Sequence, residues 1–325
     1  MTVKDDIATA RTGSTWRAQL AGQWLGRRLV RPAPNTSQAP GEAQQARWPV
    51  LRSVLGDPAA LTGALVLLAV IALALTAGYL FPGDPLDMAG APLLAPGDDP
   101  EFPLGTDALG RNIAAGIVHG ARVSLTVGLT AALVSVLMGT LIGATAGYFG
   151  GKVDRALGWL IELFQTTPSF LLVVVIVSIT QSTLGVIAVV IGLTSWDTVA
   201  RLVRAEFRAL LGAEFVLAAR SVGYGPLRII LREVLPNALP PIIVTASVIV
   251  ASAILMESSL SFLGVGDPNK VSWGSMIGNG RDMLRSALYL TAIPGLALVV
   301  TVFSLNLVGD ALITALNPRL RGRTA

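Results

Sequence analysis

The side chains in this sequence that could do chemistry are mostly carboxylates in or beside long uncharged stretches. They are Glu162, Asp197, Glu257 and Asp310. A carboxylate in such a stretch is costly to bury, so by default it indicates a function or a partner. Three of the four lie near the ends of their stretches. The interpretation we favour for them is anchoring at the membrane interface or pairing with Arg201, Arg204 or another basic end. Glu257 lies deeper than the others.

Other kinds of reaction chemistry have few residues to use. The sequence contains no cysteine, which excludes a disulfide framework and a thiolate metal site. His119 is the single histidine, which disfavours a histidine metal cluster or a catalytic triad. It is either a metal ligand or, in the interpretation we favour, an interfacial histidine with a hydrogen bond. A phosphate-binding loop is absent, because Val153 follows Gly151-Lys152 and Ala146 occupies the required glycine position.

These side chains belong to a chain with the composition of a membrane protein. Of its 325 residues, 53% are hydrophobic and 14% are charged, whereas about a quarter of a soluble domain is charged. A helix needs about 20 apolar residues to cross the hydrocarbon of a bilayer. The sequence predicts an all-α integral membrane protein with six transmembrane helices, at about 59–81, 123–149, 157–180, 184–203, 239–262 and 287–310.

Three of these helices have features of their own. The fourth is the weakest, because only 184–196 is uncharged; we count it because the charge distribution requires an even number of crossings. Pro168 predicts a kink or a local opening in the third helix. In the second, Gly139, Gly143 and Gly147 recur four residues apart, which predicts a face for close helix packing and only secondarily a pathway surface.

The basic residues predict the orientation. With the N-terminus inside, the inner segments 1–58, 150–156, 199–234 and 316–325 hold 19 of the 24 Lys and Arg residues. The first outer loop is rich in Asp and Glu instead. Because basic residues are enriched on the cytoplasmic side, both termini are predicted to be cytoplasmic. The expected domains are a cytoplasmic tail at 1–58, a transmembrane domain at 59–318 and a short cytoplasmic tail at 319–325.

The N-terminal tail has two interpretations of equal weight. Trp16, Leu20 and Trp24 recur every four residues beside several arginines, which is typical of a basic amphipathic helix at a membrane surface. The alternative is a partly disordered tail. Residues 31–49 are rich in Pro, Ala, Gln and Gly and are expected to form a linker, and the tail is too long and polar for a signal peptide.

The inner loop at 204–236 is basic and has helical periodicity. Gly223 and the pair Gly225-Pro226 interrupt the pattern, because glycine permits a left-handed turn and proline cannot continue a helix. A second helix is then expected to run as far as Leu235-Pro236. The loop is predicted to form two short helices around a glycine turn, with one apolar face and one basic face.

This loop resembles the cytoplasmic loop of the permeases of ATP-binding-cassette (ABC) importers. Members of that family carry Glu-Ala-Ala, three residues, Gly, nine residues and Ile-x-Leu-Pro. The residues that match in register are Ala218, Ala219, Gly223, Leu235 and Pro236. Leu217 stands in place of the glutamate and Glu233 in place of the isoleucine, and Glu214, one turn earlier, is a candidate for the missing carboxylate.

Further motifs narrow the resemblance to the dipeptide/oligopeptide/nickel group, and within it to the second of two paired permease subunits. They are Pro103-Leu-Gly-Thr-Asp-Ala-Leu-Gly-Arg-Asn112, Gly147-Tyr-Phe-Gly-Gly-Lys-Val-Asp154, Glu257-Ser-Ser-Leu-Ser-Phe-Leu-Gly264 and Asn306-Leu-Val-Gly-Asp310. The resemblance covers roughly 51–319.

The resemblance implies a multi-pass permease of the bacterial inner membrane, which forms a path for peptides or similar solutes with a second, homologous permease. The other implied partners are two ATPase subunits that bind ATP and magnesium, a solute-binding protein outside, and the lipid bilayer. No catalytic residue, metal or cofactor is expected in this chain. Nucleic acid is not expected as a partner, because the membrane topology explains the positions of the basic residues. The residues expected to couple the chain to the ATPases are Glu214, Ala218, Ala219, Arg220, Gly223, Leu235 and Pro236. The two small alanines are expected to allow close helix approach, and Glu257 is expected to brace helices.

Two other functions remain as alternatives. An ion-coupled secondary transporter often has inverted repeats and an ionisable site at the membrane midplane, but no clear repeat is visible here and most of the carboxylates lie near helix ends. A membrane scaffold without transport activity would leave the pattern of the 204–236 loop unexplained.

Overall fold

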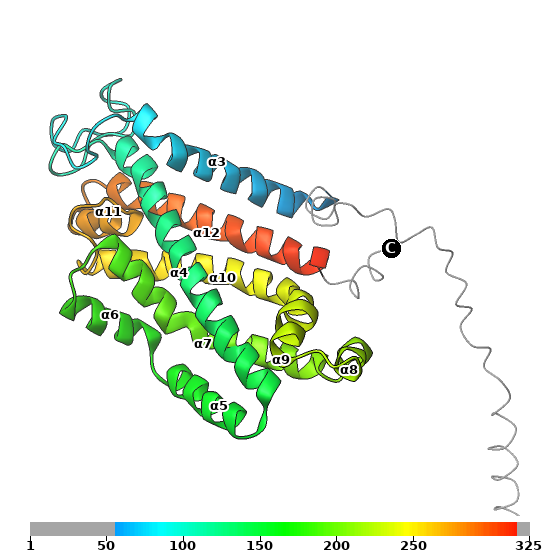
Figure 1. Ribbon diagram of the computed structural model, residues 1–325. Helices are drawn as coiled ribbons and strands as arrows, with labels where there is room; N and C mark the ends of the chain where they lie inside the picture. The colour runs from blue at the N-terminus through cyan, green and yellow to red at the C-terminus, as the bar shows by residue number, and fades with distance from the viewer. Residues whose placement is uncertain (1–55, 317–325) are drawn as a thin grey trace, which may run out of the picture. The chain divides into compact units, whose positions relative to one another are not determined.

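The computed structural model describes residues 56–316, which form helices joined by irregular segments (Figure 1). Within this range there is no β-sheet, and only two isolated bridges, Met88–Arg111 and Thr106–Asn112, are formed. The elements are α3 (Pro58–Leu80), α4 (Ile113–Phe149), α5 (Gly151–Thr166), α6 (Ser169–Ile179), α7 (Leu184–Leu210), α8 (Glu214–Ser221), α9 (Pro226–Arg228), the π-helix η2 (Ile229–Val234), α10 (Leu235–Phe262), α11 (Trp273–Gly280), the 3-10 helix η3 (Arg281–Met283) and α12 (Tyr289–Leu316). The predicted amphipathic helix and linker of the N-terminal tail, and the tail at 319–325, lie outside the described residues.

The predicted all-α membrane fold is confirmed. Among the described residues, 5 helices are long and apolar enough to cross a membrane, or 6 if the bent pair α5–α6 counts as one crossing. That pair replaces the single third helix expected at 157–180: α5 and α6 are bent by 84° relative to each other. Pro168 precedes α6 in an extended conformation, with ψ at 106°. The predicted interruption at this proline is therefore confirmed.

α7 contains the predicted crossing with the weakest apolar signal, and it is the most buried of the candidate crossings. Its most apolar window is 56% buried, whereas the windows of the other single helices are between 17% and 33% buried. Trp196, Val199, Val203 and Phe207 are fully buried along it. A helix surrounded by protein meets less lipid, so it tolerates a less uniform apolar surface. α7 also runs on to Leu210, past the predicted end at 203.

α4 and α7 form the most extensive helix pair among the described elements. Gly139, Gly143 and Gly147 lie on the contact line. A Cβ atom at Gly139 would stand 2.6 Å from the Cβ atom of Val199, and one at Gly147 would stand 2.6 Å from that of Phe207. These glycines therefore set how closely the two helix backbones approach.

α9, η2 and α10 form one continuous helix from Pro226 to Phe262. The prediction that the second loop helix ends at Leu235-Pro236 is therefore wrong. The reason lies in the hydrogen bonds: the amide of Leu235 donates to the carbonyl of Ile230, the wide spacing of a π-helix. Pro236 has no amide to donate, and it lies where the hydrogen-bond spacing returns to that of an α-helix. Because the π-helical turn has already changed the hydrogen-bond pattern at this point, the proline does not end the helix.

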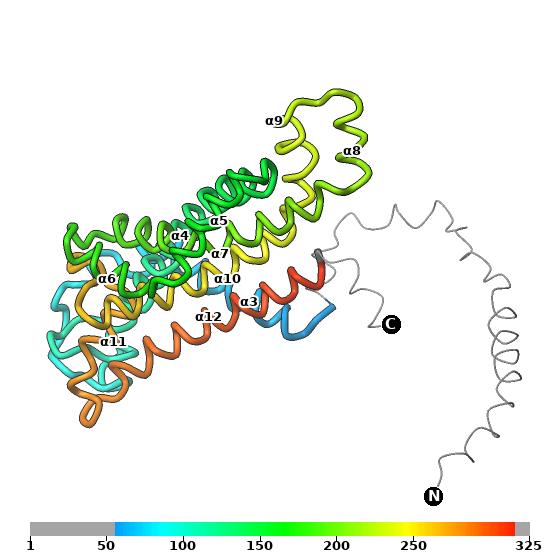
Figure 2. The backbone as a smooth tube through the Cα atoms, turned by 90° about the horizontal axis from the view of Figure 1, so that it is seen from below, coloured from blue at the N-terminus to red at the C-terminus, as the bar shows by residue number. Residues whose placement is uncertain are grey.

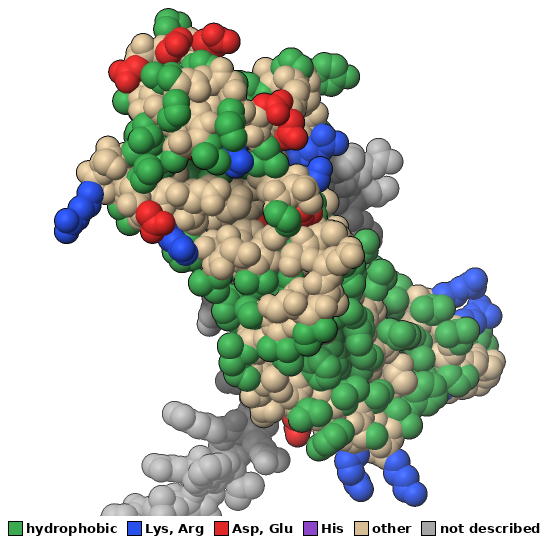
Figure 3. Space-filling model, turned by 90° about the vertical axis from the view of Figure 1, so that its left-hand side faces the viewer, with side chains coloured by type: hydrophobic (Ala, Val, Ile, Leu, Met, Phe, Trp, Pro, Cys, Tyr) green, Lys and Arg blue, Asp and Glu red, His purple; other side chains and the backbone are tan. Residues whose placement is uncertain are grey.

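The irregular segment 81–112 lies with α11 at one end of the helices, and α8 and α9 lie at the other end (Figures 1 and 2). Figure 3 looks onto the first of these ends and shows acidic side chains gathered at the top of the view. Segment 81–112 ends at Asn112, whose side chain accepts hydrogen bonds from the amides of Ala114 and Ala115. This cap starts α4 at Ile113, well before the predicted start at 123.

Candidate coupling site

α8 is a short helix held between the end of α7 and the start of α9 (Figure 2). Its inner face is apolar: Val216 is fully buried and Ala219 is 7% exposed. The two residues belong to one buried cluster with Phe207, Ile229 and Val234. Because this cluster joins α8 to α7 on one side and to η2 on the other, α8 is packed against both of its neighbours in the chain.

The outer face of α8 is exposed and partly apolar. Glu214 and Ala218 are exposed, Leu217 is 50% exposed, and Val222 just beyond the helix is 72% exposed. Exposed apolar side chains that cluster on a surface indicate a contact with a partner.

The structure divides the predicted coupling residues between two environments. The exposed ones are Glu214, Ala218, Arg220, Gly223 and Pro236. Leu235 is half-buried and Ala219 is buried. Ala219, three residues after Val216, shares the inner face of α8, so its small side chain lies against helices of this chain. Ala218 alone of the two alanines faces outward.

Gly223 forms the predicted left-handed turn after α8. Its φ is +85°, and a Cβ atom there would meet no atom within 4 Å. The turn is closed by hydrogen bonds from the amide of Gly223 to the carbonyl of Arg220, at 2.9 Å, and from the amide of Tyr224 to the carbonyl of Ala219, at 3.1 Å. Glycine is favoured here by the backbone conformation and not by a lack of space.

Two arginines of this region lie over aromatic rings. The Arg228 guanidinium carbon is 3.7 Å from the centre of the Tyr224 ring, directly after the glycine turn. The Arg220 guanidinium carbon is 5.8 Å from the ring centre of Tyr148, near the end of α4. Both distances are within the range of cation–π attraction. The second contact links α8 to the helix that carries the three packing glycines.

A buried carboxylate joins α5 to the end of α7. Asp154 Oδ1 accepts a hydrogen bond from Arg204 Nε at 2.5 Å, and its other oxygen accepts one from Arg208 Nη2. Asp154 is 8% exposed. Arg204 was one of several basic residues considered as partners of the carboxylates in the apolar stretches, and its partner is instead Asp154 of α5. Asp154 was visible as the last residue of the 147–154 motif, but nothing in the sequence indicated its partners.

The four carboxylates of the apolar stretches lie in different environments. Glu162 and Asp310 are exposed. Asp197 is buried and Arg201 follows one turn later on α7, but no ion pair among residues 56–316 joins the two side chains, so this pairing stays a prediction. Glu257 is 2% exposed and accepts a hydrogen bond from the hydroxyl of Ser261 at 2.6 Å.

His119 makes the interfacial hydrogen bond that was favoured for it: its Nε2 atom lies 3.1 Å from the carbonyl oxygen of Phe81. Among the described residues, no group of three or more His, Cys, Asp or Glu side chains could hold a metal ion.

Comparisons with known proteins agree on one family. Residues 139–322 match the family described as the binding-protein-dependent transport system inner membrane component. The di/tripeptide transport system permease protein DppC of Pseudomonas aeruginosa is 36% identical, over 83% of this chain and 91% of its own length. The oligopeptide transport system permease protein OppC of Escherichia coli is 39% identical, over 67% of this chain and 72% of its own length.

A solved structure has the same fold. A chain of the MetNI methionine ABC transporter, in an inward-facing conformation, superposes with a TM-score of 0.53 and 19% identity, over 62% of this chain and 96% of that one. Together with the sequence relatives and the arrangement of α4, α7, α8 and α10, this likeness leads to one conclusion. The chain belongs to the family of binding-protein-dependent transport system inner membrane components and is a permease subunit of an ABC importer.

Proposed function

We propose that this subunit crosses the bacterial inner membrane six times, with α5–α6 as the third crossing and both termini in the cytoplasm. The distribution of charge supports this topology, because it places 19 of the 24 Lys and Arg residues on the same side as α8. The acidic segment 81–112 then faces outward, at the opposite end of the helices from α8 (Figure 1).

In this topology α8 is the surface that meets an ATPase subunit. Its outer face offers Leu217 and Ala218, flanked by the charges of Glu214 and Arg220, and its inner face is fixed by the buried cluster beneath it. A partner that pushes on α8 would therefore move α7 and α10 with it, which is how a docked ATPase can drive rigid-body motion of membrane helices. This packing is the observation that carries the proposal.

The chain would work with a second, homologous permease, two ATPases and an extracytoplasmic solute-binding protein. ATP and magnesium would bind to the ATPases, and this chain would catalyse no reaction. The solute would be a peptide or a similar small molecule. That choice is supported by the names of relatives that are 36% and 39% identical, one a di/tripeptide and one an oligopeptide transport permease.

Single cysteines can test both the topology and the docking, because the natural chain contains none. A membrane-impermeant maleimide should label Asp99→Cys from outside intact spheroplasts. It should label Ala218→Cys only in inverted vesicles, and less so once the ATPases are bound. Ala219→Cys is the matched control one residue away: it is buried and should react slowly with or without the ATPases. Labelling of Ala218→Cys from outside would refute the topology.

Affinity purification of the tagged chain from its native membrane tests the partners. We expect a second permease and ATPase subunits to be recovered with it. Recovery of the chain alone, under conditions that keep such complexes intact, would contradict the proposal. Solute uptake that follows a proton gradient and ignores ATP depletion would instead favour an ion-coupled transporter.

A further inference from the structure

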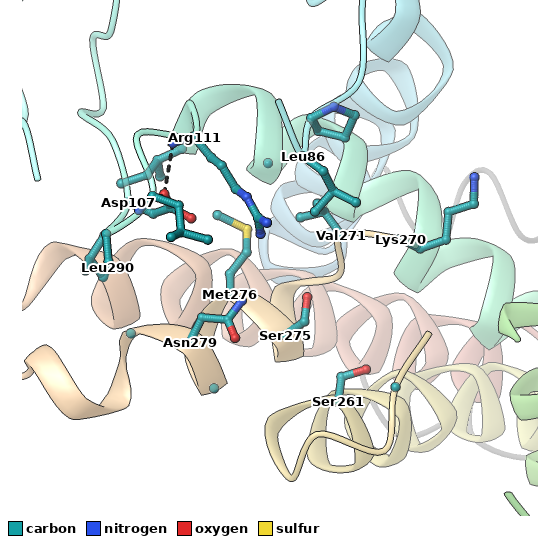
Figure 4. A pocket seen from close by; sticks show the side chains of 18 of the residues that line it. Leu86, Asp107, Arg111, Ser261, Lys270, Val271, Ser275, Met276, Asn279 and Leu290 are labelled. Atoms are coloured by element: carbon teal, nitrogen blue, oxygen red, sulfur yellow. Dashed lines mark hydrogen bonds between the residues drawn. The ribbon is translucent and has the colours of Figure 1, made fainter. Parts of the chain in front are cut away.

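A cavity of about 580 Å³ lies at the end of the helices opposite α8 (Figure 4). Its wall is formed by segment 81–112, the first turns of α4, the loop after α10, and α11. This volume is within the range of sites that hold small molecules.

Arg111 is the central cation of this cavity. Its backbone is fixed on both sides: its amide donates to Asp107 Oδ1 at 2.9 Å, and its carbonyl accepts from the amide of Asp107 at 3.0 Å. Figure 4 shows the side chain extending into the cavity between Met276 and Leu86. The Nε atom of Arg111 is buried and has no hydrogen-bond partner within residues 56–316.

The carboxylates of the wall are occupied elsewhere. Asp107 accepts hydrogen bonds from two amides of its own turn, and Asp267 accepts the amide at the start of α7 at 2.9 Å. Asp282 is paired with Arg281 at 3.7 Å. No ion pair in the part of the chain that the structure describes involves Arg111 or Lys270, which also lines the cavity. The cavity therefore combines two cations that form no ion pair, Arg111 and Lys270, with carboxylates that accept backbone amides, Asp107 and Asp267.

We propose that this cavity binds the carboxylate group of a solute, with Arg111 as the residue that holds it and Lys270 as a second attracting charge. A buried guanidinium donor without a partner is costly, and a carboxylate matches the planar fork of the guanidinium with two parallel hydrogen bonds. The inference rests on the proposed function, because a short peptide supplies such a group at its C-terminus. The subunit would then hold the solute on the outer side, before it enters the path between the two permeases.

The test uses the whole complex in lipid nanodiscs, without the solute-binding protein, and two probes: trialanine and its C-terminal amide. Saturation-transfer NMR should detect binding of trialanine and little binding of the amide. Arg111→Gln should weaken the binding of trialanine by about ten- to a hundredfold, the value of a charge-assisted hydrogen bond. Arg122→Gln is the matched control, because Arg122 is an exposed arginine of α4 that does not line the cavity. This substitution should leave the binding of trialanine unchanged.

Lys270→Gln provides a second variant that should fold normally, because Lys270 is exposed. We expect this substitution to lower the affinity for trialanine by roughly two- to fivefold. Equal binding of the two probes, unchanged binding in Arg111→Gln, or no binding of trialanine to the unmodified complex would each overturn the site. ATP-driven peptide uptake by proteoliposomes with the binding protein separates the two proposals. Uptake without direct trialanine binding refutes the cavity site alone, and trialanine binding without uptake refutes peptide import and leaves the site standing.

Discussion

Asp154 holds the end of α7 through two arginines that are buried to different degrees, and the structure predicts that they contribute unequally. The Arg204 side chain is 22% exposed and that of Arg208 is 50% exposed, against 12% for Asp154. Arg204 is also confined by α5, because a Cβ atom at Gly158 would stand 2.8 Å from its Nη2 atom. A partly buried hydrogen bond between charged groups contributes about 1.5–3 kcal/mol, whereas an exposed ion pair contributes at most about 1 kcal/mol.

Double-mutant cycles of Asp154→Asn with Arg204→Gln and with Arg208→Gln measure these two coupling energies. The free energy of unfolding of the purified complex in mixed lipid–detergent micelles is the readout. We expect about 2 kcal/mol of coupling for the Arg204 pair and less than about 1 kcal/mol for the Arg208 pair. Arg201→Gln is the matched control, because Arg201 lies on the same helix, is exposed and does not contact Asp154.

A coupling energy for Arg208 that equals or exceeds that of Arg204 would refute the argument from burial. Absence of coupling at both pairs would show that the ion pairs do not hold α5 to α7 at all. Since this junction leads directly into α8, Asp154→Asn should also lower ATP-driven uptake more than it lowers the amount of assembled complex.

Three further predictions concern packing, backbone and hydrogen bonding. Gly143→Leu should reduce the amount of folded complex, because overpacking costs about 1–3 kcal/mol or more. Gly185→Leu should be tolerated, because a Cβ atom there meets nothing within 4 Å. Equal losses of the two variants in quantitative membrane blots would contradict this prediction. Gly223→Val should insert normally but reduce ATPase binding in pull-downs, because the positive φ at this position costs a branched residue about 1–2 kcal/mol. Gly223→Asn should bind the ATPases nearly as the unmodified chain does, because asparagine adopts that conformation readily. Normal binding by the valine variant would exclude a need for this turn. Glu257→Gln keeps an acceptor for Ser261 and should retain thermal stability and uptake. Glu257→Ala should lower the free energy of unfolding by about 1–3 kcal/mol, because it leaves the buried hydroxyl of Ser261 unpaired. Loss of uptake in the glutamine variant would indicate a role for the charge of the carboxylate.

Much of the helical framework could be predicted from single residues and local patterns. Uncharged runs of about 20 residues locate crossings because lipid requires apolar side chains all round a helix. The same rule gave the weakest signal at 184–203, where α7 is shielded by its neighbours and carries the charged residues Asp197 and Arg201. The kink at Pro168 and the turn at Gly223 were also predictable, because each follows from the backbone of one residue.

What the sequence could not indicate depends on pairs of residues that are far apart in the chain. Asp154 and Arg204 are separated by 50 positions, and no local pattern distinguishes Arg204 from Arg201 as the partner. The burial of Ala219 likewise depends on Val234 and Phe207, which enclose the inner face of α8. Arg111 was noted only as part of a motif, since its unpaired guanidinium is visible only when the walls of the cavity are assembled.

The unbroken helix from Pro226 to Phe262 has a mechanical consequence. Its 37 residues, at about 1.5 Å each, make a bent rod about 55 Å long measured along its axis. The π-helical turn, Pro236, Pro240 and Pro241 lie in its first half, where Figures 1 and 2 show it change direction. One tip of this rod adjoins the glycine turn after α8, and the other reaches the wall of the Arg111 cavity through Ser261. The part after Pro241, residues 242–262, is about 30 Å long, so a tilt of about 5° around Pro241 would displace the far tip by roughly 3 Å, about the length of a hydrogen bond. A small rotation imposed by a nucleotide-binding partner would thus change the dimensions of the proposed cavity site at the opposite end of the helices.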